Sequence, residues 1–147
     1  VNIGVGGLTL TIIIILSSIF AISQLALNIL IQSLITSEVS AKLSMVFLAL
    51  ISKPAYEGMG ASFIKGMKGK KGAIKFFISL VFSLAIALLL LHFSGFLMLI
   101  TGLLTAIIMF IISKKKFGGV TGDVFGAVNE VSRMASLITV YWVVSWI

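Results

Sequence analysis

The chain has 147 residues, of which 60% are hydrophobic and only 10% are charged, and it contains no cysteine. Its mean hydropathy is +1.26. A soluble domain of this length would expose a charged surface, so the composition indicates an integral membrane protein. The absence of cysteine excludes a disulfide framework and a thiolate metal site.

A bilayer core requires roughly 20 apolar residues per helix, and the sequence contains several runs that approach this length. In chain order we predict a first span from Leu8 to about Ile31, a shorter second one over Val39–Ser52, a helical hairpin of Phe76–Phe93 and Phe96–Ser113 broken at Ser94 and Gly95, and a last span from about Asp123 to Ile147. These runs lack the alternation of a spanning β-barrel. We therefore predict an all-α fold, a polytopic membrane bundle of about five transmembrane or partly embedded helices in a single domain over residues 1–147.

The net charge of +7 does not indicate a nucleic-acid partner, because the basic residues gather between apolar runs. Nine of the eleven fall in two stretches: Lys53, Lys65, Lys68, Lys70, Lys71, Lys75 and Lys114 to Lys116. Two predicted spans separate these stretches, so both belong to one side of a cell membrane, which the positive-inside rule assigns to the cytoplasm. Counting back two more spans brings residues 1–7 to that side. We predict a cytoplasm-facing site where residues 1–7, 53–72 and 117–123 converge.

The chain has only four acidic residues, which are Glu38, Glu57, Asp123 and Glu130. Ionisable groups at membrane depth are costly and usually functional. Asp123 and Glu130 are seven positions apart, which places them on nearly the same helix face about 10 Å apart, so we expect them to point into one cavity. This separation is too long for both to bind one metal ion unaided. The alternatives are a helix N-cap for Asp123 and a salt bridge from Glu130 to Arg133.

Three glycines, Gly118, Gly119 and Gly122, precede the last predicted helix. Their unobstructed N–H groups and the positive helix end could receive a phosphate, or the segment could be an ordinary interfacial turn. Glu57 could bind a metal or a substrate hydroxyl, or simply balance the lysines around it. Lys42 follows Glu38 at a spacing of four, which favours a simple helical ion pair.

Three motifs together resemble the cobalamin synthase family, also called adenosylcobinamide-GDP ribazoletransferases. Residues 118–133, GGVTGDVFGAVNEVSR, resemble the family signature G-G-x-T-G-D-x-x-G-A-x-x-E. Residues 2–7, NIGVGG, resemble the end of its R/K-D-x-x-I-G-x-x-G segment, and residues 57–60, EGMG, match its E-G-L-G loop. Three motifs in the family's order over the whole chain are more specific than a single T-G-D.

The resemblance implies a Mg²⁺-dependent membrane transferase that joins adenosylcobinamide-GDP to α-ribazole, or to its 5′-phosphate, and releases GMP late in cobalamin assembly. It implies catalytic roles for Asp123 and Glu130, with Asp123 also holding Mg²⁺. The substrate-binding residues that it implies are Gly118, Gly119, Thr121, Gly122, Glu57, Gly58, Lys42 and Arg133. The lipid bilayer is the expected environment, and a homo-oligomer is compatible with the sequence.

Two departures from the family pattern accompany these matches. Family members begin with a further membrane region that carries an acidic G-G-x-H-x-D-G-x-x-D-x-x-D-type segment, so the chain is expected to correspond to the C-terminal part of such an enzyme, and its activity alone stays open. Arg133 stands where the family often has a second acid. The alternatives are a CDP-alcohol phosphotransferase, whose signature is absent, and a transporter or channel subunit with Glu130 and Lys42 along its pathway.

Overall fold

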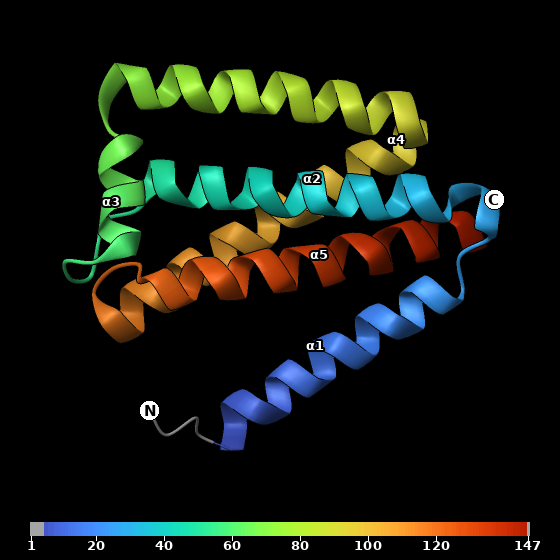
Figure 1. Ribbon diagram of the computed structural model, residues 1–147, viewed down its shortest axis with the longest axis horizontal. Helices are drawn as coiled ribbons and strands as arrows, with labels where there is room; N and C mark the ends of the chain where they lie inside the picture. The colour runs from blue at the N-terminus through green and yellow to red at the C-terminus, as the bar shows by residue number, and fades with distance from the viewer. Residues whose placement is uncertain (1–4, 147) are drawn as a thin grey trace.

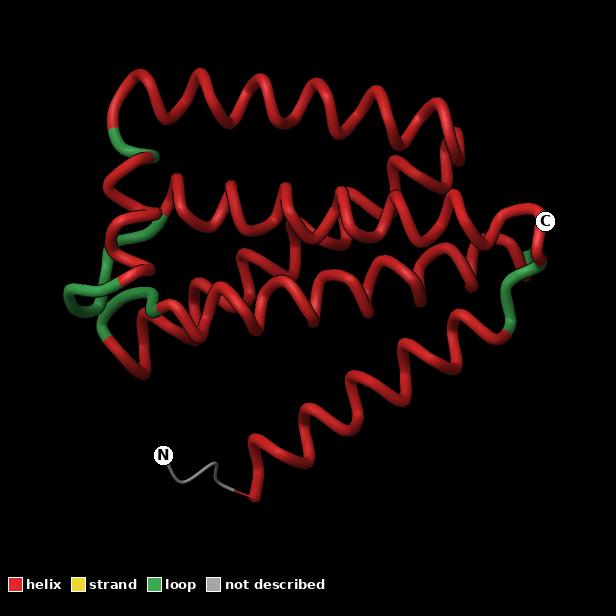
Figure 2. The backbone as a smooth tube through the Cα atoms, viewed as in Figure 1, coloured by secondary structure: helices red, strands yellow, loops and turns green. Residues whose placement is uncertain are grey.

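The computed structural model describes residues 5–146, which are helical apart from short turns and contain no strand (Figures 1 and 2). The helices are α1 (Val5–Ser23), α2 (Leu27–Ile51), α3 (Met59–Gly66), α4 (Gly69–Phe117) and α5 (Gly122–Ser145). Three of them, α1, α2 and α4, are long and apolar enough to cross a membrane. The predicted all-α fold of five helices is confirmed, although the individual boundaries differ.

The first predicted span, Leu8 to Ile31, is wrong, because it joins the end of α1 to the beginning of α2. The chain turns at residues 24–26, where the Gln24 N–H donates to the Ala21 carbonyl at 3.3 Å. The predicted second span, Val39–Ser52, is the C-terminal half of the 25-residue α2. The sequence has no glycine or proline at this turn, so no helix-breaking residue interrupts the apolar run from Leu8 to Ile31. The number of long helices before the first lysine stretch is nevertheless two, as expected.

Helix α4 folds back on itself, as the predicted hairpin requires. A straight helix of its 49 residues would be roughly 70 Å long, more than twice the bilayer core. The break lies at His92, whose φ of 49° and ψ of −127° are not helical, two residues before the predicted break. A Cβ atom at Gly95 would lie 2.1 Å from the Ala87 carbonyl oxygen, so glycine permits the two halves to meet closely beside the bend.

The centre of the bundle is formed by α2, α5 and the second half of α4, which meet through small and polar residues. Ser40 on α2 donates to the Met98 carbonyl at 2.8 Å, and its hydroxyl oxygen lies 2.9 Å from that of Ser136 on α5. A Cβ atom at Gly102 would lie 2.2 Å from the Ser40 hydroxyl oxygen. Close backbone approach and hydrogen bonds between helices are typical of packing in a membrane.

Helix α1 lies apart from the other helices over most of its length (Figure 1). It contacts α5, where the rings of Phe20 and Tyr141 are 5.9 Å apart, and diverges from the bundle toward Val5. Its large apolar side chains are mostly exposed. The divergence leaves a wedge between α1 and the pair formed by α2 and α5.

The ends of the helices define two ends of the bundle (Figure 1). The α2–α3 loop, α3 and the α4–α5 turn lie together at one end, whereas the α1–α2 turn and the bend in α4 lie at the opposite end. The predicted convergence of residues 53–72 and 117–123 is therefore confirmed. Most of the predicted N-terminal segment, residues 1–4, lies outside the described residues.

Candidate functional site

The lysine-rich loop after α2 and the turn before α5 are joined by backbone hydrogen bonds. The Val120 N–H donates to the Lys53 carbonyl at 2.9 Å, and the Ala55 N–H donates to the Val120 carbonyl at 3.1 Å. These bonds form an isolated parallel bridge between Pro54 and Val120. Segments more than sixty residues apart in the sequence are thus held side by side.

Two glycines permit this close approach. A Cβ atom at Gly119 would lie 2.7 Å from the Ala55 nitrogen and from the Lys53 carbonyl oxygen. At Gly60, the second residue of α3, a Cβ atom would lie 2.8 Å from the Gly122 nitrogen. Real Cβ atoms do not approach backbone this closely, so a larger residue at either position would separate the two segments.

The pocket that results, here called the glycine pocket, has a volume of about 160 Å³. It is lined by Tyr56, Gly58, Met59, Gly60, Ala61, Thr121, Gly122 and Asp123. Thr121 caps α5, because its hydroxyl accepts a hydrogen bond from the Val124 N–H at 3.4 Å. The sequence alternative of Asp123 as the N-cap is wrong, since Asp123 lies inside the first turn. Its carboxylate is exposed on the pocket wall beside the positive end of α5.

Residues 118–122 lie in different surroundings, and phosphate binding by them stays a prediction. Gly118 ends α4 with φ of 70°, and its N–H donates to the Lys114 carbonyl at 3.2 Å. Gly119 is buried against residues 53–55. Only Thr121 and Gly122 of this set line the glycine pocket. The glycine-rich signature therefore divides into a helix end, a close backbone contact and a pocket wall.

Of the predicted residues in the α2–α3 loop, Gly58 lines the pocket and Glu57 does not. The Glu57 side chain is 97% exposed, and its only ion pair among the described residues is with Lys65 at 3.8 Å. An exposed pair of this length contributes little stability. A substrate-binding role for Glu57 stays a prediction.

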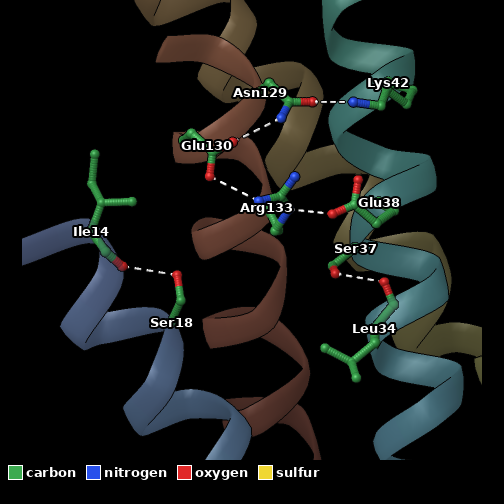
Figure 3. Close-up of polar contacts among 9 residues, drawn as sticks. All are labelled: Ile14, Ser18, Leu34, Ser37, Glu38, Lys42, Asn129, Glu130 and Arg133. Atoms are coloured by element: carbon green, nitrogen blue, oxygen red, sulfur yellow. Dashed lines mark hydrogen bonds and ion pairs between the residues drawn. The ribbon is translucent and has the colours of Figure 1, made fainter. Parts of the chain in front are cut away.

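A second polar centre connects the middle of α2 with α5 (Figure 3). Arg133 forms ion pairs with Glu38 on α2 and with Glu130 on its own helix, the latter at 2.8 Å. The Asn129 amide donates to Glu130 at 3.0 Å and accepts from the Lys42 ammonium at 2.8 Å. We call these five residues the charged network. Two acids and two bases balance one another within it.

The charged network tests two ion pairs that the sequence suggested. The predicted Glu130–Arg133 pair is confirmed, whereas the Glu38–Lys42 pair is not found, because Glu38 turns to Arg133 and Lys42 to Asn129. Sequence reasoning overlooked Asn129, whose partner Lys42 is 87 positions away and is related to it by no periodicity. The only feature of the sequence that could have identified Asn129 is its position next to Glu130.

Asp123 and Glu130 line two different cavities, contrary to the prediction that they share one. Asp123 lies on the glycine pocket, whereas Glu130 lies on a cavity of about 310 Å³ between α1, α2 and α5. Glu38 and Arg133 line this second cavity as well, together with mainly apolar residues of α1 (Figure 3). The two acids do lie on α5, as the helical spacing predicted, but different neighbouring elements pack around each of them.

The fold and these two centres define an α-helical protein that has three helices long and apolar enough to cross a membrane and a glycine-lined pocket at one end. The family model described as "Cobalamin-5-phosphate synthase" matches residues 1–141. The chain belongs to this family.

The relatives carry the name adenosylcobinamide-GDP ribazoletransferase. The protein of Thermoanaerobacter pseudethanolicus is 32% identical over 140 residues, which are 93% of this chain and 54% of the relative. That of Thermococcus kodakarensis is 29% identical over 145 residues, 97% of this chain and 60% of the relative. That of Methanosarcina barkeri is 32% identical over 155 residues, with coverage of 93% and 54%. The chain thus spans about half the length of these relatives. No solved structure matches it.

Proposed function

We propose that the chain forms part of the active site of an adenosylcobinamide-GDP ribazoletransferase, which joins adenosylcobinamide-GDP to α-ribazole or its 5′-phosphate and releases GMP. The observation that carries this proposal is the glycine pocket. It brings residues 58–60 against residues 121–123, and both groups belong to segments that resemble family motifs. The match over residues 1–141 and the names of the relatives support the same activity.

In the proposed reaction, the ribazole hydroxyl oxygen attacks the phosphorus atom that carries cobinamide. A new P–O bond forms, the bond from this phosphorus to the GMP oxygen breaks, and the hydroxyl proton passes to a base. Gly58 and Gly122 would let a diphosphate approach the backbone. The free N–H groups at the first turn of α5 would stabilise the negative charge on the phosphoryl oxygens.

Asp123 fits a role as one ligand of Mg²⁺. Magnesium sites often use one or two carboxylates together with substrate phosphates and water, and Asp123 is an exposed carboxylate on a pocket wall. No group of three or more potential His, Asp or Glu ligands occurs in residues 5–146. The remaining ligands would therefore be phosphate oxygens, water or groups outside these residues. When bound, the ion would neutralise charge on the diphosphate.

The other predicted site residues would act outside the glycine pocket. Glu130, Arg133 and Lys42 belong to the charged network, and we propose that they orient a more distant part of the substrate. Glu57 would contact substrate from the exposed loop. The lysine-rich end would face the cytoplasm of a cell in whose membrane the protein is embedded. The phosphotransferase and transporter alternatives gain no support from the comparisons.

The proposal can be tested by binding of adenosylcobinamide-GDP to the chain in lipid vesicles, with Mg²⁺ or with a chelator. Asp123→Asn should weaken the Mg²⁺-dependent binding about tenfold or more, because a charge-assisted contact is lost, and Asp123→Glu should retain part of it. GMP release should fall in parallel when the chain forms the matching part of a full-length ribazoletransferase. Equal binding and equal GMP release by Asp123→Asn and the wild type would contradict the assignment.

A further inference from the structure

A third pocket lies beside the Pro54–Val120 bridge and belongs to neither polar centre. Its volume is about 200 Å³. We call it the lysine pocket, and it is lined by Ile51, Lys53, Phe110, Lys114, Gly118, Gly119 and Val120. It combines two cations with an apolar floor at the end of the bundle where α2 and α4 both end.

Neither cation is neutralised by a carboxylate of residues 5–146. Lys53 and Lys114 form no ion pair with any of the described acids. The Lys114 ammonium lies 6.0 Å from the centre of the Phe110 ring, which lines the same pocket. The Gly119 N–H donates to no acceptor within the described part of the chain. Two uncompensated charges and a spare backbone donor at one cavity are suited to an anion.

The helix surface next to the lysine pocket is suited to hydrocarbon. Ile107, Ile111 and Lys114 follow one another at spacings of four and three, so they lie along one face of α4. Ile107 and Ile111 are exposed. An apolar stripe that ends in a lysine indicates a ligand with a negatively charged head and an apolar tail.

We propose that the lysine pocket binds the phosphate group of an anionic phospholipid, whose acyl chain lies along the Ile107–Ile111 stripe. The head group would contact Lys53, Lys114 and the Gly119 N–H. This contact would hold residues 53–55 against residues 118–120, the bridge that also positions the glycine pocket. Bound lipid thus stabilises the contact between residues 53–55 and residues 118–120. The inference does not depend on the proposed transferase activity.

The test is lipid binding by the purified full chain in detergent, with phosphatidylglycerol compared with phosphatidylcholine. The wild type should bind phosphatidylglycerol more tightly and should melt at a higher temperature in its presence. Each lysine near an anionic head group contributes about fivefold in affinity, so Lys53→Gln/Lys114→Gln should lose about 30-fold. Lys68→Gln/Lys71→Gln removes the same charge from the same end and should change the affinity about twofold or less.

A conservative variant and two soluble competitors complete the experiment. Lys114→Arg keeps the charge and should retain binding. If circular dichroism shows that the double variant does not fold, Lys53→Gln and Lys114→Gln are measured singly, and each should lose about fivefold. Equal affinity for the two lipids, or an equal loss in the Lys68/Lys71 control, would overturn the proposal. So would complete displacement of the lipid by inorganic phosphate or by GDP at comparable concentration, since either result would assign the pocket to a free phosphate compound.

Discussion

Arg133 is the side chain on which the charged network depends. It lies about three turns into α5, and it is only 29% exposed between Glu38 and Glu130. Two carboxylates without a cation between them would repel each other in a cavity lined mainly by apolar residues. The guanidinium can pair with both carboxylates because it presents several N–H donors in one plane.

Replacing Arg133 by Met should therefore lower the free energy of unfolding by about 1–3 kcal/mol, less than for a fully buried pair because both acids are about half exposed. The triple variant Glu38→Gln/Glu130→Gln/Arg133→Met removes all three charges and should recover most of this loss. Thermal melting of the purified chain in detergent measures both. A triple variant no more stable than Arg133→Met would show that the ion pairs are not the cause.

At the level of the helices, Gly102 sets how closely α4 approaches α2. Its neighbours on α2 are the hydroxyl oxygens of Ser40 and Ser44, which would lie 2.2 and 2.8 Å from an added Cβ atom. Ser132 on α5 also donates to the Gly102 carbonyl at 3.4 Å. The three helices thus meet at one glycine, as small residues permit in membrane bundles.

Gly102→Ala should destabilise the protein by about 1–3 kcal/mol, because the new methyl group meets atoms that are already packed. Gly126→Ala is the matched control, since nothing lies within 4 Å of its added Cβ atom. In a helix interior that substitution should be neutral or stabilising by up to about 1 kcal/mol. Adding Ser40→Ala to Gly102→Ala should relieve part of the loss. Equal melting temperatures for the two alanine variants would show that Gly102 is not a packing contact.

Across the molecule, every turn of the described chain belongs to one of two ends. The lysine-bearing segments around the start and at the end of α4 share one end, and the α4 bend and the C-terminal part of α5 share the other (Figure 1). The chain contains no cysteine, so single cysteines can report these positions without a background.

Lys68→Cys and Lys115→Cys should react with a membrane-impermeant maleimide from the same side of sealed vesicles. Ser94→Cys and Ser145→Cys should react from the opposite side only, because α4 folds back at His92. The labelled fraction before and after the vesicles are opened with detergent measures the sidedness. Labelling of Lys68→Cys and Lys115→Cys from opposite sides would contradict the hairpin in α4.

Some features of the structure could be predicted from the sequence and others could not. The helical class, the hairpin of α4 and the common end of both lysine stretches follow from apolar run length and charge distribution, which are local properties of the chain. The boundary at residues 24–26 could not be predicted, because this turn contains no helix-breaking residue. The pairing of Glu130 with Arg133 was predictable because both lie on one helix.

The membrane setting, the helical content and the segments that carry family motifs can all be read from the sequence alone. The division of the glycine-rich turn cannot: Gly118 and Gly119 serve a helix end and a backbone contact, while Asp123 lines a pocket that Glu130 does not share. The folded chain also pairs Glu38 with Arg133 and Lys42 with Asn129, in place of the expected pair on one helix. Composition and periodicity describe each helix separately, whereas a pocket or a polar partner depends on side chains that a different helix supplies.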